Sequence, residues 1–365
     1  MIATRRALLA LTLLALLTGC PPAGQQPAAA PSGNAPAGAA ELNLLIYSEY
    51  IDPALLAEFE QKHGAPVKVS LFESPDEMLQ KVQLGGGKSQ FDLIVASSQH
   101  VATMARLGLI KQLDHAALKN LGNVAPRFKD AAYDPGFAHS VPYQWGTVGI
   151  LWDKEKVKAL EPSWSVIFDP AKQPGTFWLI DDMRDQLGAA LKSLGHSVNS
   201  GDAAQLKAAG ELVLKAKQSE KCLGFEGGVG GKNKVLGGTA DLAVVWNGDA
   251  LKAIDESKGR LAFAIPAEGA SCWVDCMVIP AEAPRPDLAH AFIDFILDPQ
   301  VGARLSNFNR YASPNQAALP HIRPEDRDNP CVYPPEALLA KLELLADLGE
   351  GAKLYDEVWT AVKSR

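Results

Sequence analysis

Trp273 and Asp275 lie two residues apart in a run of bulky and β-branched residues that extends from Ser271 to Met277. Such a run predicts a β-strand, and side chains two apart on a strand point to the same face. A flat aromatic ring beside a carboxylate suits an organic cation, because the acid pairs with a charged nitrogen while the ring attracts the cation or covers its methylene groups. A core tryptophan beside a loop-capping aspartate gives the same pattern, so this pair alone leaves both interpretations open.

Two further acidic segments follow predicted strands. Asp182 and Asp185 come directly after a short apolar strand, and Asp249 follows Trp246 at the end of another. Asp182 and Asp185 begin a predicted helix, where residues three apart share one face. Acids also favour the positive end of a helix dipole, which is the structural explanation for them. Two carboxylates at such a junction nevertheless repel each other unless a cation lies between them.

The elements that position these residues alternate along the chain. Apolar runs predict strands at 42–47, 67–72, 91–96, 177–180 and 241–246, and capping and periodicity predict helices at 53–64, 75–85, 101–107, 181–194, 288–297, 338–348 and 352–362. This alternation indicates an α/β fold with a mainly parallel sheet, whose ligands bind beyond the carboxyl ends of the strands. Tyr47, Ser48 and Tyr50 follow the first strand and Ser97 follows the third, so we expect them at such a site.

The N-terminus predicts export and a lipid anchor. Residues 1–20 combine Arg5 and Arg6, a short apolar run and the sequence Leu17-Thr18-Gly19-Cys20, which together are typical of a bacterial lipoprotein signal peptide with Cys20 as the acylated residue. An ordinary secretory signal is the alternative. Residues 21–41 are rich in Pro, Ala and Gly and predict a flexible tether.

The composition predicts a globular protein outside the membrane. Hydrophobic residues make up 47% of the chain and charged residues 21%, which is enough for a substantial core. The segment after the tether is too long for one ordinary domain and fits two. No other stretch is long and apolar enough to cross a membrane. The net charge of −7 argues against nucleic acid as a partner and suits a cationic one.

Four cysteines remain after Cys20, and in an oxidising compartment they could pair. Cys272 and Cys276 are too far apart on one strand to bond to each other, at about 13 Å. Either could bond to Cys222 or Cys331, and the sequence leaves the pairing open. The spacing of Cys and His does not fit a zinc site.

Several motifs, taken in order, resemble the spermidine/putrescine-binding proteins of bacterial ABC polyamine importers. They are Tyr47-Ser48-Glu49-Tyr50, Phe91-Asp92-Leu93-Ile94-Val95, Tyr133-Asp134-Pro135, Val141-Pro142-Tyr143-Gln144-Trp145-Gly146, Asp181-Asp182, Val245-Trp246-Asn247-Gly248 and Trp273-Val274-Asp275. The resemblance implies a two-lobed type II periplasmic-binding-protein fold, with a ligand cleft between lobes that two crossover strands join. The first lobe is expected to comprise 42–146 and 274–319, and the second 147–273 and 320–365.

The resemblance also implies a role for each candidate ligand-binding residue. An aromatic box would consist of Tyr47, Tyr50, Trp246, Trp273 and Tyr311; amine-binding acids would be Asp182, Asp185, Asp249 and Asp275; and Ser48 and Ser97 would bind the other end of the ligand. Asp249 matches an acid of putrescine-preferring members, whereas Gln99 stands where an aromatic residue is common and Leu345 near a position that carries Gln in spermidine binders. The choice between putrescine and spermidine stays open.

The expected function is that of a lipid-anchored binding protein in the periplasm or at the cell surface, which delivers a polyamine to the permease of an ABC importer. It would be a monomer without catalytic activity, cofactor, metal or nucleic-acid partner. One alternative is another organic cation or iron on the same scaffold, although iron sites of this class use adjacent tyrosines, which the chain lacks. The other is an extracellular hydrolase using Asp182 and Asp185, which lie too close together for an acid–base pair across a bond.

Overall fold

The computed structural model describes residues 41–83 and 89–365. The predicted signal peptide, Cys20 and the tether up to residue 40 lie outside the described residues. The part from residue 41 onward belongs to one unit, and the fold described below is that of this unit.

The described chain begins with alternating strands and helices. These are β1 (Leu42–Tyr47), α1 (Pro53–His63), β2 (Val67–Phe72), α2 (Pro75–Gln83), β3 (Leu93–Ser97) and α3 (Ser98–Arg106). β1 lies between β2 and β3 and is parallel to both. Asp52 begins α1 by accepting a hydrogen bond from the backbone N–H of Ala54 (2.9 Å), and Gly64 ends it with φ 66°. The predicted series of parallel strands and helices is confirmed here.

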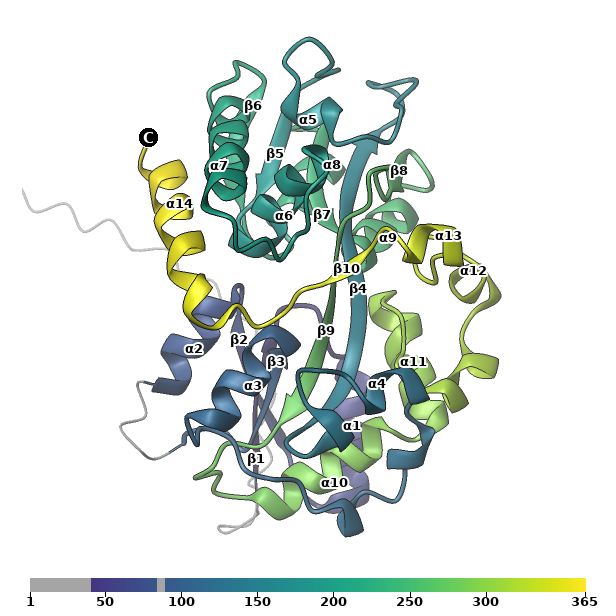
Figure 1. Ribbon diagram of the computed structural model, residues 1–365. Helices are drawn as coiled ribbons and strands as arrows, with labels where there is room; N and C mark the ends of the chain where they lie inside the picture. Colours follow the sequence, from purple (N-terminus) through teal and green to yellow (C-terminus); the bar gives the residue numbers. More distant parts are fainter. Residues whose placement is uncertain (1–40, 84–88) are drawn as a thin grey trace, which may run out of the picture. The chain divides into compact units, whose positions relative to one another are not determined.

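Two long strands, β4 (Ser140–Asp153) and β9 (Ser271–Val278), connect the two halves of the sheet (Figure 1). The other strands are β5 (Phe177–Ile180), β6 (Cys222–Glu226), β7 (Leu242–Trp246), β8 (Leu261–Ala264) and β10 (Glu343–Leu344). The strand order is β2-β1-β3-β9-β4-β7-β5-β6, with β10 beside β9 and β8 beside β4. β9 is antiparallel to both β3 and β4, and β4 is also antiparallel to β7, so this pair forms the two predicted crossover strands.

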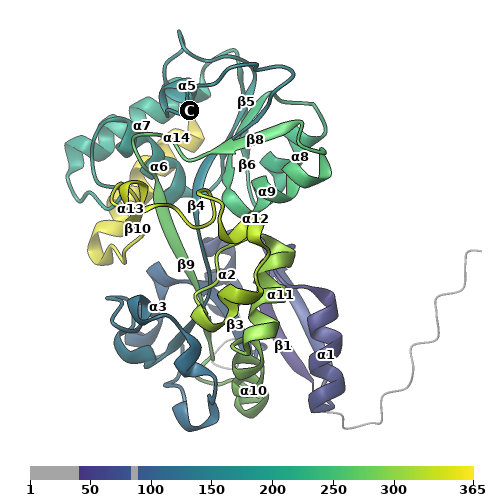
Figure 2. The same ribbon diagram turned by 90° about the vertical axis from the view of Figure 1, so that its right-hand side faces the viewer.

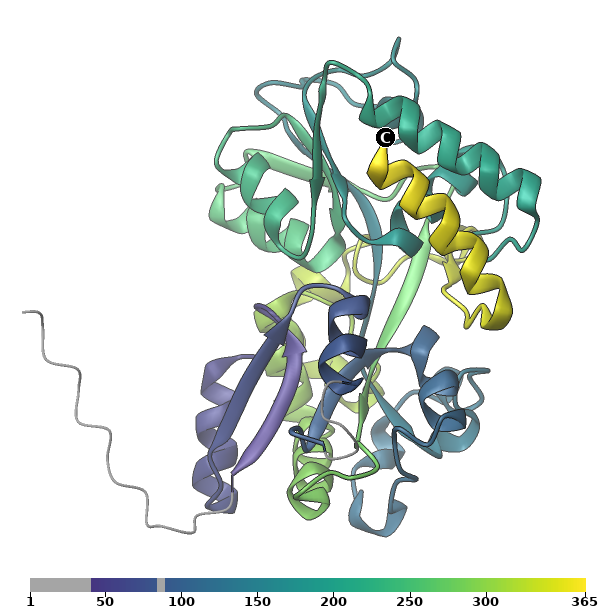
Figure 3. The same ribbon diagram turned by 90° about the vertical axis from the view of Figure 1, so that its left-hand side faces the viewer.

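The remaining helices cover the sheet. They are α4 (Pro126–Lys129), α5 (Ser165–Phe168), α6 (Met183–Ser193), α7 (Ala203–Lys217), α8 (Gly230–Leu236), α9 (Asn247–Glu256), α10 (Pro286–Ile296), α11 (Pro299–Asn309), α12 (Pro324–Arg327), α13 (Glu336–Leu339) and α14 (Ala352–Ser364). Figure 2 shows α1, α10 and α11 with the strands β1 and β3, and Figure 3 shows α14 beside α7.

Two hydrophobic cores form on either side of the crossover strands. One contains Leu44, Phe59 and Phe292 and surrounds β1 and β3, and we refer to it as the core of the first lobe. The other contains Phe177 and Tyr355 and surrounds β5 and β7, and it is the core of the second lobe. The residue boundaries expected for the lobes stay a prediction.

The prediction of a helix at 338–348 is wrong. The segment instead contains the end of α13 and then β10, which runs parallel to β9. The backbone N–H of Glu343 donates to the carbonyl of Ala270 (3.2 Å), and that of Leu345 donates to the carbonyl of Cys272 (2.9 Å). Pairing with an available strand edge therefore outweighs the helix propensity of the leucine-rich sequence, which is only a weak local preference.

The cysteines Cys222, Cys272, Cys276 and Cys331 are all free thiols, so the pairings that the sequence left open are not formed. Within 41–83 and 89–365, no helix is both long and apolar enough to cross a membrane.

Candidate ligand-binding site

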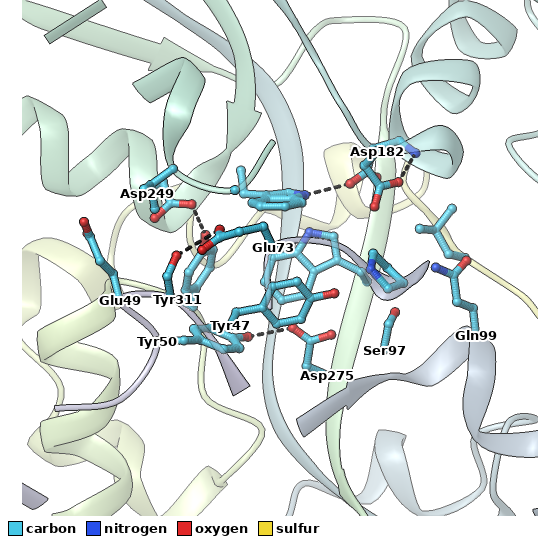
Figure 4. Close-up of a pocket in the computed structure, with 18 residues that line it drawn as sticks. Tyr47, Glu49, Tyr50, Glu73, Ser97, Gln99, Asp182, Asp249, Asp275 and Tyr311 are labelled. Carbon is cyan, nitrogen blue, oxygen red and sulfur yellow. Dashed lines mark hydrogen bonds between the residues drawn. The ribbon is translucent and has the colours of Figure 1, made fainter. Parts of the chain in front are cut away.

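All eleven predicted ligand-binding residues line one pocket (Figure 4). The space between its wall atoms is about 580 Å³, part of it open to solvent. The predicted residues are Tyr47, Ser48, Tyr50, Ser97, Asp182, Asp185, Trp246, Asp249, Trp273, Asp275 and Tyr311. The structure thus gathers residues that are separated by more than two hundred positions in the sequence.

Strand ends explain why these residues meet. β1 and β3 of the first lobe and β5 and β7 of the second all end at the pocket, and each is followed by polar or aromatic side chains. The pair that the strand pattern singled out lies on crossover strand β9, where Asp275 pairs with Gln144 of β4 and Trp273 pairs with Gly146. Both lobes and a crossover strand therefore contribute to the same walls.

Aromatic rings form a continuous wall. The Trp273 and Tyr311 ring centroids lie 5.1 Å apart, those of Tyr311 and Tyr50 5.4 Å, and those of Tyr50 and Tyr47 5.9 Å. Tyr47 of the first lobe also meets Trp246 of the second, with 6.2 Å between centroids. All four pairs are edge-to-face, a favourable arrangement that holds each ring in place.

Close packing on glycine fixes one of these rings. A Cβ atom added to Gly248, in the first turn of α9, would lie 2.6 Å from three atoms of the Tyr311 ring. Gly248 therefore allows Tyr311 to lie against α9, where its hydroxyl donates to Asp249 Oδ2 (2.9 Å). Gly248 and its neighbour Asp249 therefore both hold the Tyr311 ring in place.

The buried acids accept hydrogen bonds mainly from neutral groups of the pocket. Asp275 Oδ2 accepts from the Tyr50 hydroxyl (2.9 Å), and Asp185 accepts from Trp246 Nε1 (2.7 Å) and from the Ser271 hydroxyl. Asp182 accepts from the backbone N–H of Asp185 (3.0 Å) and so also caps α6. This agrees with the structural explanation of an acid at the start of a helix. Within the described chain, no Lys or Arg forms an ion pair with Asp185, Asp249 or Asp275.

Burial changes the acidity of these groups. It raises the pKa of Asp275 to about 7, helped by the charges of Asp185 and Asp182, and it raises the pKa of Asp249 to about 6. Burial also raises the pKa of Asp185. A carboxylate that resists ionisation in a dry pocket is stabilised when a cation joins it, so these shifts favour a positively charged ligand.

The acids lie on different sides of the pocket. Figure 4 shows Asp249 on one side, Asp182 on the other and Asp275 below them, with Tyr50 and Tyr47 near the centre. Charged sites separated by aromatic surface match an elongated molecule with positive groups joined by an apolar chain.

Other residues line the pocket that were not in the predicted set: Glu49, Glu73, Pro75, Gln99, Gly228, Val229 and Leu345. Glu73 Oε2 accepts from the Ser48 hydroxyl (3.0 Å), so the first lobe supplies a further acid. The only sequence signal for Glu73 is its place just beyond the end of β2. Gln99 and Leu345 had been noted only as departures from the family pattern.

The described residues contain no group of three or more His, Cys, Asp or Glu side chains that could hold a metal ion. His100 is not among the residues that line the pocket.

Comparison with known proteins agrees with this geometry. Residues 54–328 match the family of bacterial extracellular solute-binding proteins. A putrescine/cadaverine-binding protein of Pseudomonas aeruginosa is 35% identical over 347 residues, which cover 92% of this chain and 97% of the relative. A spermidine/putrescine-binding periplasmic protein of Salmonella typhimurium is 30% identical, with 87% of this chain and 90% of the relative covered.

Solved structures show the same fold. The Tp0655 (TpPotD) lipoprotein of Treponema pallidum superimposes with a TM-score of 0.78 at 28% identity, covering 89% of this chain and all of that chain. The fold is the type II periplasmic-binding-protein fold, as the sequence motifs implied.

Proposed function

This chain belongs to the bacterial extracellular solute-binding proteins, and we propose that it binds a polyamine between its lobes and delivers it to the permease of an ABC importer. Its relatives are named as binding proteins for putrescine and cadaverine or for spermidine and putrescine, which supports this assignment. So does the agreement between the predicted ligand-binding residues and the walls of one pocket. The eleven predicted residues are the proposed ligand contacts.

One observation carries the proposal: three buried acids that form no ion pair within the described residues share a pocket with aromatic rings. Asp185 is 2% exposed, Asp275 6% and Asp249 7%. Polyamine nitrogens resemble the lysine ammonium group, whose pKa is about 10.4, and stay charged at neutral pH. A ligand with several such groups supplies a countercharge for each acid.

The apolar part of the pocket suits the rest of the ligand. Each buried methylene contributes about 0.8 kcal/mol, and an aromatic face adds roughly 0.5–2 kcal/mol for each cation that lies against it. The rings of Tyr50, Trp273 and Tyr311 lie among the acids and cover the path between them. Neither a lone metal ion nor a rigid ring compound would use both features.

Capture requires no chemistry. Contacts from both lobes to one ligand favour the closed arrangement of the lobes over the open one, and hinge motion at the crossover strands allows the exchange. The closed form then docks on the permease. We further propose that the protein acts as a monomer, held to a bacterial membrane by lipid on Cys20 and exposed to the periplasm or the cell surface, and that its lobes have the boundaries predicted from the sequence.

The test replaces Asp182, Asp185, Asp249 and Asp275 together by Asn and measures putrescine and spermidine binding by isothermal titration calorimetry. Asn keeps the side-chain shape and can still cap α6 at position 182. We expect the affinity to fall at least about 100-fold, because an unpaired buried charge costs about 3–5 kcal/mol. The control is Asp130→Asn, an exposed acid away from the pocket. Unchanged affinity in a folded quadruple variant would exclude polyamine binding at this site.

A further inference from the structure

A glycine-rich segment of the second lobe borders the candidate pocket. Four of the five residues at 227–231 are glycines, and the segment runs from the end of β6 into α8. Two of the five, Gly228 and Val229, line the pocket. Because glycine has no Cβ atom, it lets a neighbouring group approach the backbone closely. The neighbours of each glycine therefore indicate why it stands there.

The glycines of this segment have neighbours in different lobes. A Cβ atom added to Gly231 would lie 3.3 Å from Val245 of β7, within the second lobe. At Gly228, the three atoms nearest to an added Cβ belong instead to Glu73, which lies between β2 and α2 of the first lobe. The added atom would overlap with Glu73 Oε2 and lie 3.0 Å from Glu73 Cδ. The lobes thus touch at a point where the second lobe presents bare backbone.

Glu73 is held at this contact by its own lobe. Its Oε2, the atom that faces Gly228, accepts a hydrogen bond from the Ser48 hydroxyl (3.0 Å). Its backbone N–H donates to Glu77 Oε2 (2.8 Å) in α2, which fixes the turn between β2 and α2. Glu73 and Gly228 both line the pocket, where Figure 4 shows the Glu73 side chain. Their contact is therefore part of the pocket wall.

The backbone conformation at position 228 also favours glycine. Its φ of 49° lies in the left-handed region, which other residues adopt less readily. Gly238, in the turn after α8, has a similar backbone with φ 74°, but no heavy atom of the described residues lies within 4 Å of its Cβ position. The two glycines share the requirement for a left-handed backbone and differ in the contact with the first lobe.

We propose that Gly228 is the closing point of the cleft, where the missing side chain lets Glu73 complete the pocket wall as the lobes come together. A Cβ atom there would displace the Glu73 carboxylate from the Ser48 hydroxyl or stop the lobes before they close fully. Either change admits water, which weakens the attraction between the buried acids and a cation. This role rests on the proposed function and concerns how the same site is closed.

The experiment measures the rates of putrescine binding and release by stopped flow for the wild type, Gly228→Ala and Gly238→Ala. The contact exists only when the lobes are closed, so its loss acts on release. We expect putrescine to dissociate about threefold to tenfold faster from Gly228→Ala, with the association rate changed less than about twofold. Gly238→Ala has the same backbone requirement and should change neither rate. Equal effects of the two substitutions, or no effect of Gly228→Ala, would overturn the role of Gly228.

A second set of variants tests the partner residue. Glu73→Ala removes the atoms that an added Cβ at position 228 would overlap and leaves the two Cβ atoms 3.6 Å apart, an ordinary contact. Whatever Glu73→Ala does alone, we expect the further change Gly228→Ala to alter the dissociation rate less than about twofold in that background. A full effect there would contradict the contact. If alanine unfolds the protein, asparagine, which adopts left-handed conformations more readily, replaces it at positions 228 and 238.

The outcomes also separate the closing contact from the proposed function. Failure of the folded wild-type protein to bind putrescine or spermidine, once freed of carried-over ligand, would remove the proposed function and the role of Gly228 with it. Binding by the wild type together with a wrong prediction for Gly228→Ala would overturn the closing contact alone, while the polyamine assignment stands.

Discussion

Asp275 and Asp249 link ligand binding to pH. Burial raises their pKa values to about 7 and about 6, whereas an aspartate in an unfolded chain titrates near 3.9. Polyamine ammonium groups keep their protons throughout this range, so the change comes from the protein. As the pH falls below 7, protons compete with the ligand for these carboxylates.

We therefore expect the affinity for a polyamine to fall about tenfold between pH 8 and pH 6, the amount that protonation of one group with a pKa of about 7 produces. Calorimetric titrations across this range measure the trend, and titrations in buffers of different ionisation heat measure the protons released on binding. Asp275→Asn should bind more weakly at pH 8 and lose most of the pH dependence. An affinity that stays constant from pH 8 to pH 6 would contradict an ionisable acid at the centre of the site.

The stability of the ligand-free protein changes with pH in the opposite direction from the ligand affinity. Because the folded state holds protons on Asp275 and Asp249 more tightly than the unfolded state, these groups make the ligand-free protein less stable as the pH rises from about 4 to about 7. A bound polyamine reverses this contribution, since it binds the ionised form. The stabilisation that a polyamine gives should consequently grow with pH.

At the scale of single residues, the sequence predicted pocket residues where spacing or strand ends place them. Trp273 and Asp275 follow from the two-residue repeat of a strand, and Asp182 follows from its place after β5. Glu49 and Glu73 were missed because their positions depend on turns. Glu49, for example, has φ 53°, a left-handed conformation that is uncommon outside glycine. The residues around Glu49 in the sequence do not indicate this conformation.

At the scale of elements, the contact between α9 and the Tyr311 ring predicts the effect of Gly248→Ala. Alanine inside a helix usually stabilises by about 0.5–1 kcal/mol relative to glycine. Here the added Cβ would meet the ring at 2.6 Å, push it aside and break its hydrogen bond to Asp249. We expect lower stability in thermal unfolding and polyamine affinity reduced about tenfold, in line with overpacking costs of about 1–3 kcal/mol.

The matched control is Gly188→Ala in α6. A Cβ there would make only an ordinary contact, 3.4 Å from Val198, so this substitution should be neutral or stabilising and leave ligand binding as it is. If Gly248→Ala behaves like Gly188→Ala in both measurements, the close approach of the ring to α9 is not what positions it.

A helix or strand could be predicted where residues close to it in the sequence mark its beginning and end. β1, β2 and β5 have the predicted bounds, because each is a short apolar run bordered by turn or capping residues. The segment 338–348 was predicted as a helix from its leucines, yet its backbone pairs with β9, which is far away in the sequence. No local pattern shows that a strand edge will be available, so this part of the second lobe could not be predicted from the sequence.

At the scale of the whole described unit, ionic and polar contacts join the lobes outside the aromatic wall. Glu49 precedes α1 of the first lobe, and its partners Lys232 and Lys252 belong to α8 and α9 of the second. Arg184 of α6 donates to Gln99 of α3, again between the lobes. The left-handed backbone of Glu49 costs about 1 kcal/mol, which the two ion pairs offset in this arrangement. Opening of the lobes would have to break these contacts.

Lys252→Met tests whether this cluster holds the lobes together. Lys252 does not line the pocket. Met keeps the apolar part of the side chain but removes the ammonium group, which pairs with Glu49 and also lies 5.1 Å from the centre of the Phe308 ring. An ion pair that is partly exposed contributes about 0.2–1 kcal/mol, so we expect the ligand to dissociate about twofold to fivefold faster in stopped-flow measurements, with little change in the association rate. Small-angle scattering should show a larger radius of gyration without ligand, because the open arrangement becomes more populated.

The control for charge alone is Lys207→Met, which removes a lysine from an ion pair within α7 of the second lobe and should change neither quantity. High salt should reduce the difference between the wild type and Lys252→Met, since it screens the exposed part of the Glu49 cluster in both states. If dissociation from Lys252→Met is as slow as from the wild type at low salt, the ligand and the aromatic wall hold the closed state by themselves.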